Sequence, residues 1–204
     1  MIAMAAIGIY GGTFDPVHAG HIKVAERAYA QLELEKMLLI PANNPWLKEG
    51  TPITRFQHRY RMLEIAVEGR LGLEVSDVEG RRDGPTYTFD TVKQLQLEYP
   101  GRDLVLVAGG DSVETMPRWH RVKELLSLCR VMVYRRSTDT TGDIELIIAN
   151  LGGEMKWIEG PNLEISATEI RTLIATGRNP QEKMPIGVYN YISKKGLYAD
   201  TVSS

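Results

Sequence analysis

Short apolar runs rich in β-branched residues alternate along the chain with longer segments in which apolar residues recur every three or four positions. The short runs predict buried strands, and the recurring pattern predicts amphipathic helices. Strands are predicted at 6–10, 37–41, 73–76, 104–108, 131–134 and 155–158. The helix after the first strand has one apolar stripe, formed by Ile22, Ala25, Ala28, Tyr29 and Leu32.

A second helix is predicted from Thr54, as its N-cap, through Glu68. Its inward-facing residues are expected to be Phe56, Tyr60, Leu63 and Val67. Further helices are predicted at 89–98, 118–128, 144–151, 166–176 and 185–195, and Gly177 is expected to close the helix that ends at 176. Strands separated by helices need right-handed crossovers, which give a parallel sheet with helices on both faces. We therefore predict a Rossmann-like, doubly wound α/β fold in a single domain, 1–204, with 160–204 as its C-terminal helical part.

Composition narrows the classes of function. The 204 residues are 43% apolar and 25% charged, which is typical of a globular protein. The net charge of -2 gives no general attraction for nucleic acid or a membrane surface, so an anionic ligand must be held by local groups. The lone Cys129 excludes an internal disulfide, and no apolar run approaches the roughly 20 residues that cross a bilayer. We expect a cytoplasmic protein without nucleic-acid or membrane partners, and homo-oligomer formation stays open.

The segment GGTFDPVHAGH, 11–21, carries the densest candidate chemistry. Gly11 and Gly12 permit close backbone approach and a positive φ, and Gly20 opens space at the helix entrance. A helix N-terminus favours phosphate, and His18 and His21 can each donate to a phosphoryl oxygen. Two alternatives stay open: a tight turn with one capping and one solvent-exposed histidine, or a zinc site that adds Asp15.

A second candidate segment is ISATEIR, 165–171. Ser166 and Thr168 place hydroxyls at a helix start, and Arg171 lies one turn further on. Together they can clamp a phosphate, although Ser166 can also be a plain N-cap beside a surface arginine. We expect this segment and the histidine segment to converge around one polyphosphate.

These segments carry a family resemblance. HAGH at 18–21 resembles the (H/T)-x-G-H signature of the nucleotidyltransferase superfamily, and its longer context resembles the bacterial nicotinate-nucleotide adenylyltransferases. ISATEIR resembles that family's I-S-x-T-x-x-R motif, LVLVAGGDSVETMPRW at 104–119 its G-x-D-S strand end with a following tryptophan, and GPTYTFDT at 84–91 its substrate loop. The segment IPANNPWLKEG at 40–50 departs from the family's N-P-P-H-(K/R) pattern at Trp46 and Leu47, and His120 stands where a tyrosine is expected.

The resemblance implies adenylyl transfer from ATP to the 5′-phosphate of nicotinate mononucleotide in NAD biosynthesis. The products would be nicotinate adenine dinucleotide and pyrophosphate, formed by direct in-line attack without a covalent intermediate. Mg²⁺ is expected to accompany ATP, held mainly by phosphates and water. The implied catalytic residues are His18, His21 and Arg171. The implied contacts of ATP and its phosphates are Gly11, Gly12, Thr13, Phe14, Gly20, Gly109, Asp111, Ser166 and Thr168. The implied contacts of nicotinate mononucleotide are Asn44, Lys48, Tyr87, Thr88 and Trp119.

Simpler interpretations of several of these residues stay open. Asp111 can cap the following short helix, Thr86 or Thr88 can cap the helix near 89, and Trp119 can be an ordinary half-buried aromatic. Rival functions are phosphopantetheine adenylyl transfer, non-catalytic nucleotide binding, and the class I aminoacyl-tRNA synthetases, which share a similar histidine pair. The combination of two histidines and Arg171 favours an enzyme, because binding adenosine alone needs no triphosphate clamp.

Overall fold

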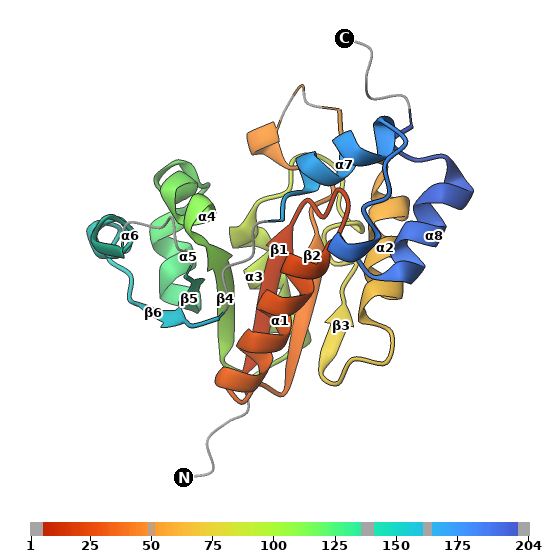
Figure 1. The fold of residues 1–204 in the computed structure, drawn as a ribbon. Helices are drawn as coiled ribbons and strands as arrows, with labels where there is room; N and C mark the ends of the chain where they lie inside the picture. The colour runs from red at the N-terminus through yellow and green to blue at the C-terminus, as the bar shows by residue number, and fades with distance from the viewer. Residues whose placement is uncertain (1–5, 49, 51, 136–140, 161–164, 200–204) are drawn as a thin grey trace.

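One six-stranded parallel sheet forms the centre of the molecule (Figure 1). The structure, a computed structural model, describes residues 6–48, 50, 52–135, 141–160 and 165–199. The strands are β1 (Ile7–Gly12), β2 (Lys36–Pro41), β3 (Leu73–Val75), β4 (Leu104–Gly109), β5 (Arg130–Tyr134) and β6 (Met155–Ile158). Their order is β3-β2-β1-β4-β5-β6, so the predicted strands and the predicted parallel sheet are confirmed.

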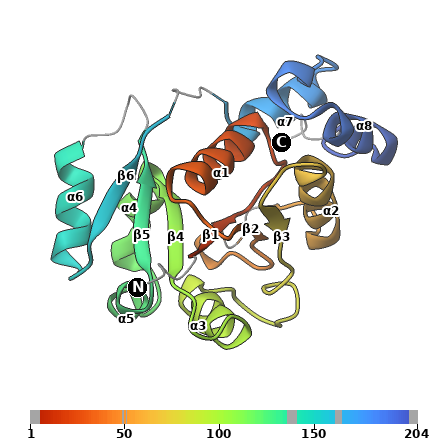
Figure 2. The same cartoon turned by 90° about the horizontal axis from the view of Figure 1, so that it is seen from below.

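Helices cover both faces of this sheet (Figure 2). The α-helices are α1 (Ala19–Gln31), α2 (Phe56–Val67), α3 (Thr88–Glu98), α4 (Gly110–Thr115), α5 (Val122–Leu128), α6 (Thr141–Asn150), α7 (Ala167–Ala175) and α8 (Ile186–Lys195). The short 3₁₀ helices are η1 (Trp46–Lys48), η2 (Met116–Arg118) and η3 (Gln181–Lys183). None of the helices in the described ranges has the length and apolarity needed to cross a membrane.

The strands supply side chains to two separate cores, one on each face. In β2, Met37 and Leu39 join the core under α1, α2, α7 and α8, whereas Leu38 and Ile40 join the core under α3 to α6. A strand buried on both faces reads as a continuous apolar run, which explains the pattern in the sequence. The C-terminal helices α7 and α8 share the first of these cores, through Ile170, Val188 and Ile192.

Two helix predictions were wrong in detail. Helix α2 begins at Phe56 after Arg55, not at Thr54, and its buried residues are Arg59, Met62, Leu63 and Ala66. Only Leu63 belongs to the predicted stripe, because Arg59 is drawn inward by backbone carbonyl groups. The helix predicted at 118–128 is divided into η2 and α5, because Arg121 adopts a left-handed conformation with a φ of 53° between them.

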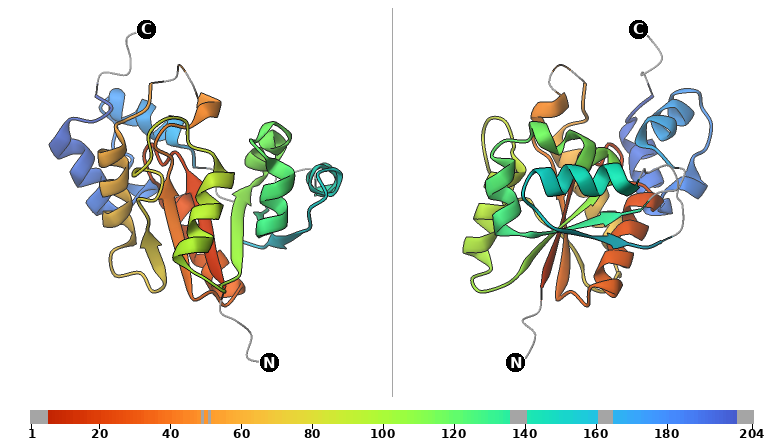
Figure 3. Two further views of the ribbon diagram at one scale, coloured as in Figure 1. Left: turned by 180° about the vertical axis from the view of Figure 1, so that it is seen from behind. Right: turned by 90° about the vertical axis from the view of Figure 1, so that its left-hand side faces the viewer.

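The strand order places a switch point between β1 and β4, because the strand that follows β1 lies on one side of this pair and the strand that follows β4 lies on the other. In doubly wound folds the ligand binds beyond the carboxyl ends of the strands at such a point. Helix α7 lies at this end of the sheet, the upper end in both views of Figure 3. The loops after β1, β2 and β4 therefore surround the candidate site.

Candidate functional site

The loop between β1 and α1 holds the two histidines as a reciprocal helix cap. The backbone N–H of His21 donates to Nδ1 of His18 over 3.4 Å, and the N–H of His18 donates to Nδ1 of His21 over 3.3 Å. Their rings stack with centroids 3.6 Å apart and an interplanar angle of 23°. Because each Nδ1 accepts a hydrogen bond, a neutral ring carries its own proton on Nε2, which can then donate a hydrogen bond. The capping interpretation is confirmed for His18, and the structure extends it to His21.

Neighbouring residues fix the orientation of these rings. A Cβ at Gly20 would lie 3.0 Å from two atoms of the His18 ring, so glycine is needed for that ring to fold back over α1. Phe14 is buried, and its ring meets the His21 ring edge-on with centroids 4.9 Å apart. The positive φ expected at Gly11 or Gly12 occurs instead at Phe14, at 49°, because both glycines still belong to β1.

Asp15 anchors the loop from three directions. Its carboxylate accepts from the Thr54 N–H over 3.2 Å and from the Tyr198 hydroxyl over 2.6 Å. Its carbonyl oxygen accepts from Nη1 of Arg171 over 2.7 Å. These contacts aim the carboxylate at α2 and the C-terminal segment, while the Nδ1 atoms of both histidines face the backbone. Consistent with this, the residues that the structure describes contain no group of three metal-binding side chains, which argues against the zinc alternative.

Helix α7 places Arg171 in contact with the loop between β1 and α1, 13–18, which we call the histidine loop. Residues Asp15 and Arg171 are 156 positions apart in sequence, so their hydrogen bond confirms the expected convergence of the two segments. Nη2 of Arg171 also donates to the Thr168 hydroxyl over 3.2 Å. Ser166 is the N-cap of α7, and its Oγ accepts from the Glu169 N–H over 3.1 Å. The N-cap interpretation of Ser166 is therefore also confirmed.

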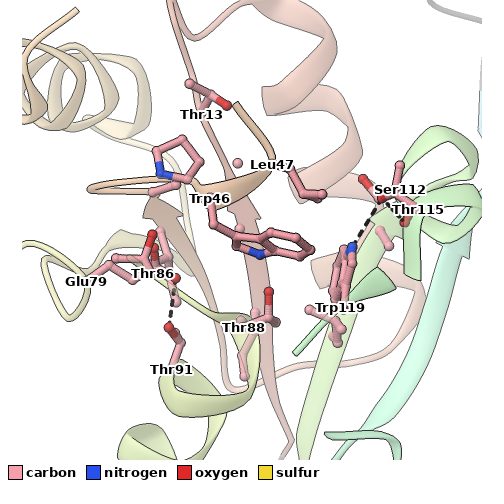
Figure 4. A pocket seen from close by; sticks show the side chains of 18 of the residues that line it. Thr13, Trp46, Leu47, Glu79, Thr86, Thr88, Thr91, Ser112, Thr115 and Trp119 are labelled. Carbon is pink, nitrogen blue, oxygen red and sulfur yellow. Dashed lines mark hydrogen bonds between the residues drawn. The ribbon is translucent and has the colours of Figure 1, made fainter. Parts of the chain in front are cut away.

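A cavity of about 210 Å³ lies next to this loop, at the carboxyl ends of β1, β2 and β4. Five predicted site residues line it, namely Gly11, Gly12, Thr13, Thr88 and Trp119. Trp46 from η1 and Trp119 after η2 both project into it (Figure 4). Within the described ranges its lining does not include His18, His21 or Arg171, so the site has two adjoining parts.

The loops after β2 and before α3 are joined along one wall of the cavity. The Thr86 N–H donates to the Asn44 carbonyl over 2.9 Å, and Pro45 pairs with Thr86 in an isolated parallel bridge. Tyr87 is the residue before α3, and its ring lies 4.5 Å from the His120 ring. The N-cap position therefore belongs to Tyr87, so neither Thr86 nor Thr88 is the cap. The side chain of Lys48, another predicted contact, lies outside the described part of the structure.

The floor of the cavity contains a buried carboxylate. Glu79 accepts from the Thr91 hydroxyl over 2.7 Å, and the same hydroxyl oxygen accepts from Arg82 over 2.6 Å. Burial raises the pKa of Glu79, opposed by the hydroxyls of Thr91 and Thr86 and by the charge of Arg82. Oγ1 of Thr86 is buried beside this cluster and faces the Glu79 carboxylate.

The end of β4 carries the remaining predicted contacts. Gly109 is the N-cap residue of α4, and Asp111 lies exposed in the first turn of that helix. Asp111 is therefore not the cap. Trp119 is half-buried, and its Nε1 donates to the Thr115 hydroxyl over 3.1 Å, which fixes the indole at the cavity wall.

Comparison with known proteins identifies the family. The Cytidylyltransferase-like family matches residues 9–173. A protein of Thermomicrobium roseum named "Probable nicotinate-nucleotide adenylyltransferase" is 37% identical over 198 residues, which cover 96% of this chain and 92% of that protein. A protein of the same name from Geobacillus thermodenitrificans is 35% identical, over 98% of this chain and 89% of its own. This chain belongs to the nicotinate-nucleotide adenylyltransferase family.

A solved member from Plasmodium falciparum, described as nicotinic acid mononucleotide adenylyltransferase complexed with NaAD, has the same fold. Its TM-score is 0.81 at 19% identity, and the match covers 98% of this chain and all of that one. The motif-based resemblance to nicotinate-nucleotide adenylyltransferases is thus confirmed, as is the assignment to the nucleotidyltransferases. Membership in this family sets aside the synthetase and non-catalytic alternatives.

Several residues of this adenylyltransferase site were missed in the sequence. Arg59, only 1% exposed, donates to the carbonyl groups of Thr54, Thr13 and Asn43 over 2.7, 2.8 and 3.4 Å. Burial lowers its pKa, opposed by the nearby Asp15. A signal was present, because Arg59 is spaced three, four and seven positions from Met62, Leu63 and Ala66 and so falls on their apolar stripe. Glu79, which lines the cavity, carried no comparable signal, and Trp46 and Thr86 were noted in the sequence without a role in the site.

Proposed function

We propose that this protein transfers the adenylyl group of ATP to the 5′-phosphate of nicotinate mononucleotide. The observation that carries the proposal is the contact of Arg171 with the histidine loop, beside a cavity lined by two tryptophans. The first part offers the guanidinium of Arg171 and two imidazole N–H groups as donors for a polyphosphate, and the second offers aromatic walls for a heterocyclic ring. Relatives that cover almost the whole chain carry the same name, which supports this choice of acceptor.

The proposed reaction needs no general base. The second pKa of a phosphate monoester is about 6, so the acceptor oxygen is already ionised at neutral pH. It attacks the α-phosphorus of ATP in line, and pyrophosphate leaves without a covalent enzyme intermediate. Catalysis then consists of aligning two anions and neutralising the charge that develops.

The residues take the following proposed roles. His18 and His21 donate from Nε2 to the α- and β-phosphates, and Arg171 binds the departing pyrophosphate together with Ser166 and Thr168. The backbone at Gly11, Gly12, Thr13, Phe14, Gly20 and Gly109 lets the nucleotide approach, and Asp111 accepts from its ribose. The acceptor is assigned to Asn44, Lys48, Tyr87, Thr88 and Trp119.

Mg²⁺ enters this proposal with ATP. Magnesium keeps several waters and takes its other ligands from substrate phosphates, so a site poor in clustered carboxylates suits it. Among the described residues no group of three acidic or histidine side chains is gathered, which fits an ion held mainly by the nucleotide. The ion would supply further neutralisation of phosphate charge.

The test is pyrophosphate release from ATP and Mg²⁺ with nicotinate mononucleotide, nicotinamide mononucleotide or phosphopantetheine in separate reactions. We expect release with nicotinate mononucleotide, and the nicotinamide reaction measures how strictly the acid is preferred. Release with phosphopantetheine alone would assign the rival acceptor. Absence of release in all three reactions would refute adenylyl transfer to these acceptors.

A further inference from the structure

We propose that Tyr198, near the C-terminus, is a positioning residue for adenylyl transfer, because its hydroxyl holds Asp15 and thereby the loop that presents His18 and His21. The expected effect on kcat rests on the proposed function. Tyr198 does not contact the reacting groups in this proposal. Its hydroxyl lies close to Asp15 and Thr54, and it acts on the histidines through Asp15.

The contact is short and buried, and it joins residues that are far apart in the sequence. The Tyr198 hydroxyl donates to a carboxylate oxygen of Asp15 over 2.6 Å, and the two residues are 183 positions apart. Tyr198 is 8% exposed and Asp15 is 7% exposed. Burial and the Asp15 carboxylate raise the pKa of the Tyr198 phenol, so it remains a proton donor at neutral pH.

The backbone at Tyr198 is also adapted to this contact. Its φ of 65° lies in the left-handed region, which disfavours residues with a Cβ. A glycine would adopt this conformation without penalty, but it could not supply the hydroxyl. The surrounding structure therefore holds an unfavourable conformation at the position from which the side chain reaches Asp15.

Asp15 is well placed to transmit this contact. It lies three residues before His18, the residue that caps α1, and its carbonyl oxygen accepts from Arg171. Its second carboxylate oxygen accepts from the Thr54 N–H. Asp15 in the histidine loop thus joins Tyr198, Arg171 and the segment before α2. A displacement of catalytic groups by about 1 Å is enough to reduce turnover strongly.

The chain offers a matched control in Tyr191. Its hydroxyl pairs with Nδ1 of His58 over 2.8 Å and joins α8 to α2 without touching Asp15. Tyr198→Phe and Tyr191→Phe therefore each remove one hydroxyl from the C-terminal segment. We expect both to lower Tm, and only Tyr198→Phe to lower kcat, by about tenfold, with both KM values changed less than twofold.

Hydrogen–deuterium exchange supplies a readout that does not need turnover. Amides in 13–18 should exchange faster in Tyr198→Phe than in the wild type and in Tyr191→Phe, measured at a temperature where each protein is folded. In an Asp15→Asn background, Tyr198→Phe should cause little additional loss of kcat, because the two residues act as one unit.

The inference is overturned if both phenylalanine variants lower Tm while kcat and the exchange of 13–18 stay at wild-type values. It is also overturned if the effects of Asp15→Asn and Tyr198→Phe on kcat multiply independently. A wild-type protein that releases no pyrophosphate with any acceptor would refute the proposed function instead, and the exchange comparison would still decide whether Tyr198 orders the loop.

Discussion

The phosphate side of the site, formed by the loop 13–18 and α7, differs from the acceptor side, formed by the cavity beside β2 and α3, in how its polar groups are engaged. On the phosphate side, the two histidines are hydrogen-bonded to each other, and Asp15 is hydrogen-bonded to Arg171 and Tyr198 from the C-terminal part of the fold. On the acceptor side, two indoles and the hydroxyl of Thr86 line an open volume. Groups that stabilise developing charge act best when they are fixed beforehand, whereas a pocket must keep space and polar atoms for its ligand.

The largest effect is expected on the phosphate side, from His21→Ala. Loss of one preorganised donor to the transition state should lower kcat by about 10²–10³. His21→Asn keeps an oxygen that can accept from the His18 N–H, and so separates capping from catalysis. Steady-state pyrophosphate release measures both variants, and wild-type kcat in His21→Asn would reduce His21 to a structural cap.

Arg171→Lys tests whether the phosphate side depends on a forked donor. Arg171 uses separate nitrogen atoms for Asp15 and Thr168, and lysine cannot reproduce that geometry. A hydrogen bond to a charged group contributes about 1.5–3 kcal/mol, so kcat should fall roughly 10- to 100-fold. The KM for nicotinate mononucleotide should change little. An acceptor KM that rises as much as kcat falls would contradict the division of the site into two sides.

Trp119→Ala should weaken acceptor binding and leave ATP binding unchanged. Stacking of a base on an aromatic ring contributes about 1–3 kcal/mol, so the KM for nicotinate mononucleotide should rise about tenfold. The KM for ATP should stay near its wild-type value. Trp157→Ala is a control, because Trp157 lies on β6 and donates to Glu145. Equal effects of the two variants would show that Trp119 has no specific role.

Thr86→Val tests whether the buried Thr86 hydroxyl beside Glu79 serves ligand binding as well as stability. Valine removes a hydroxyl that stabilises the Glu79 carboxylate, so the free energy of unfolding should fall by about 1 kcal/mol. The acceptor KM should rise a few-fold at the same time. Denaturant titration and kinetics measure the two effects, and a less stable variant with an unchanged KM would separate Thr86 from acceptor binding.

The smallest effect concerns Glu79 and pH. Burial raises the pKa of Glu79 above its ordinary value near 4.5, so the folded protein binds this proton more tightly than the unfolded chain does. Ionised Glu79 therefore lowers stability at neutral pH, and this loss fades as the pH falls towards the ordinary value. Glu79→Gln should be more stable than wild type at pH 7 and equally stable near about pH 4. A stability difference that does not change with pH would exclude this cause.

Much of the fold followed from local patterns, and the exceptions have physical causes. The central strands were predictable because they are apolar runs buried on both faces, as Met37 to Ile40 illustrate. The edge strands β3 and β6 are only partly buried, and their spacing between helices identified them. The segments with His18, His21 and Arg171 were predictable because the residues of each candidate site are close together in the sequence. The buried face of α2 was not predictable, because it depends on Arg59 reaching carbonyl groups of distant loops. The contact of Tyr198 with Asp15 likewise depends on how the last helix packs.

Arg59 has a consequence for how the protein meets its ligands. A cation enclosed under the loop after β1 acts as a permanent counter-ion that is in place before any nucleotide arrives. Dissolved ions cannot gather around an enclosed guanidinium as they do around a surface lysine, so added salt weakens its field much less. The part of its field that the nearby Asp15 does not balance should therefore persist at ionic strengths that would screen an exposed charge.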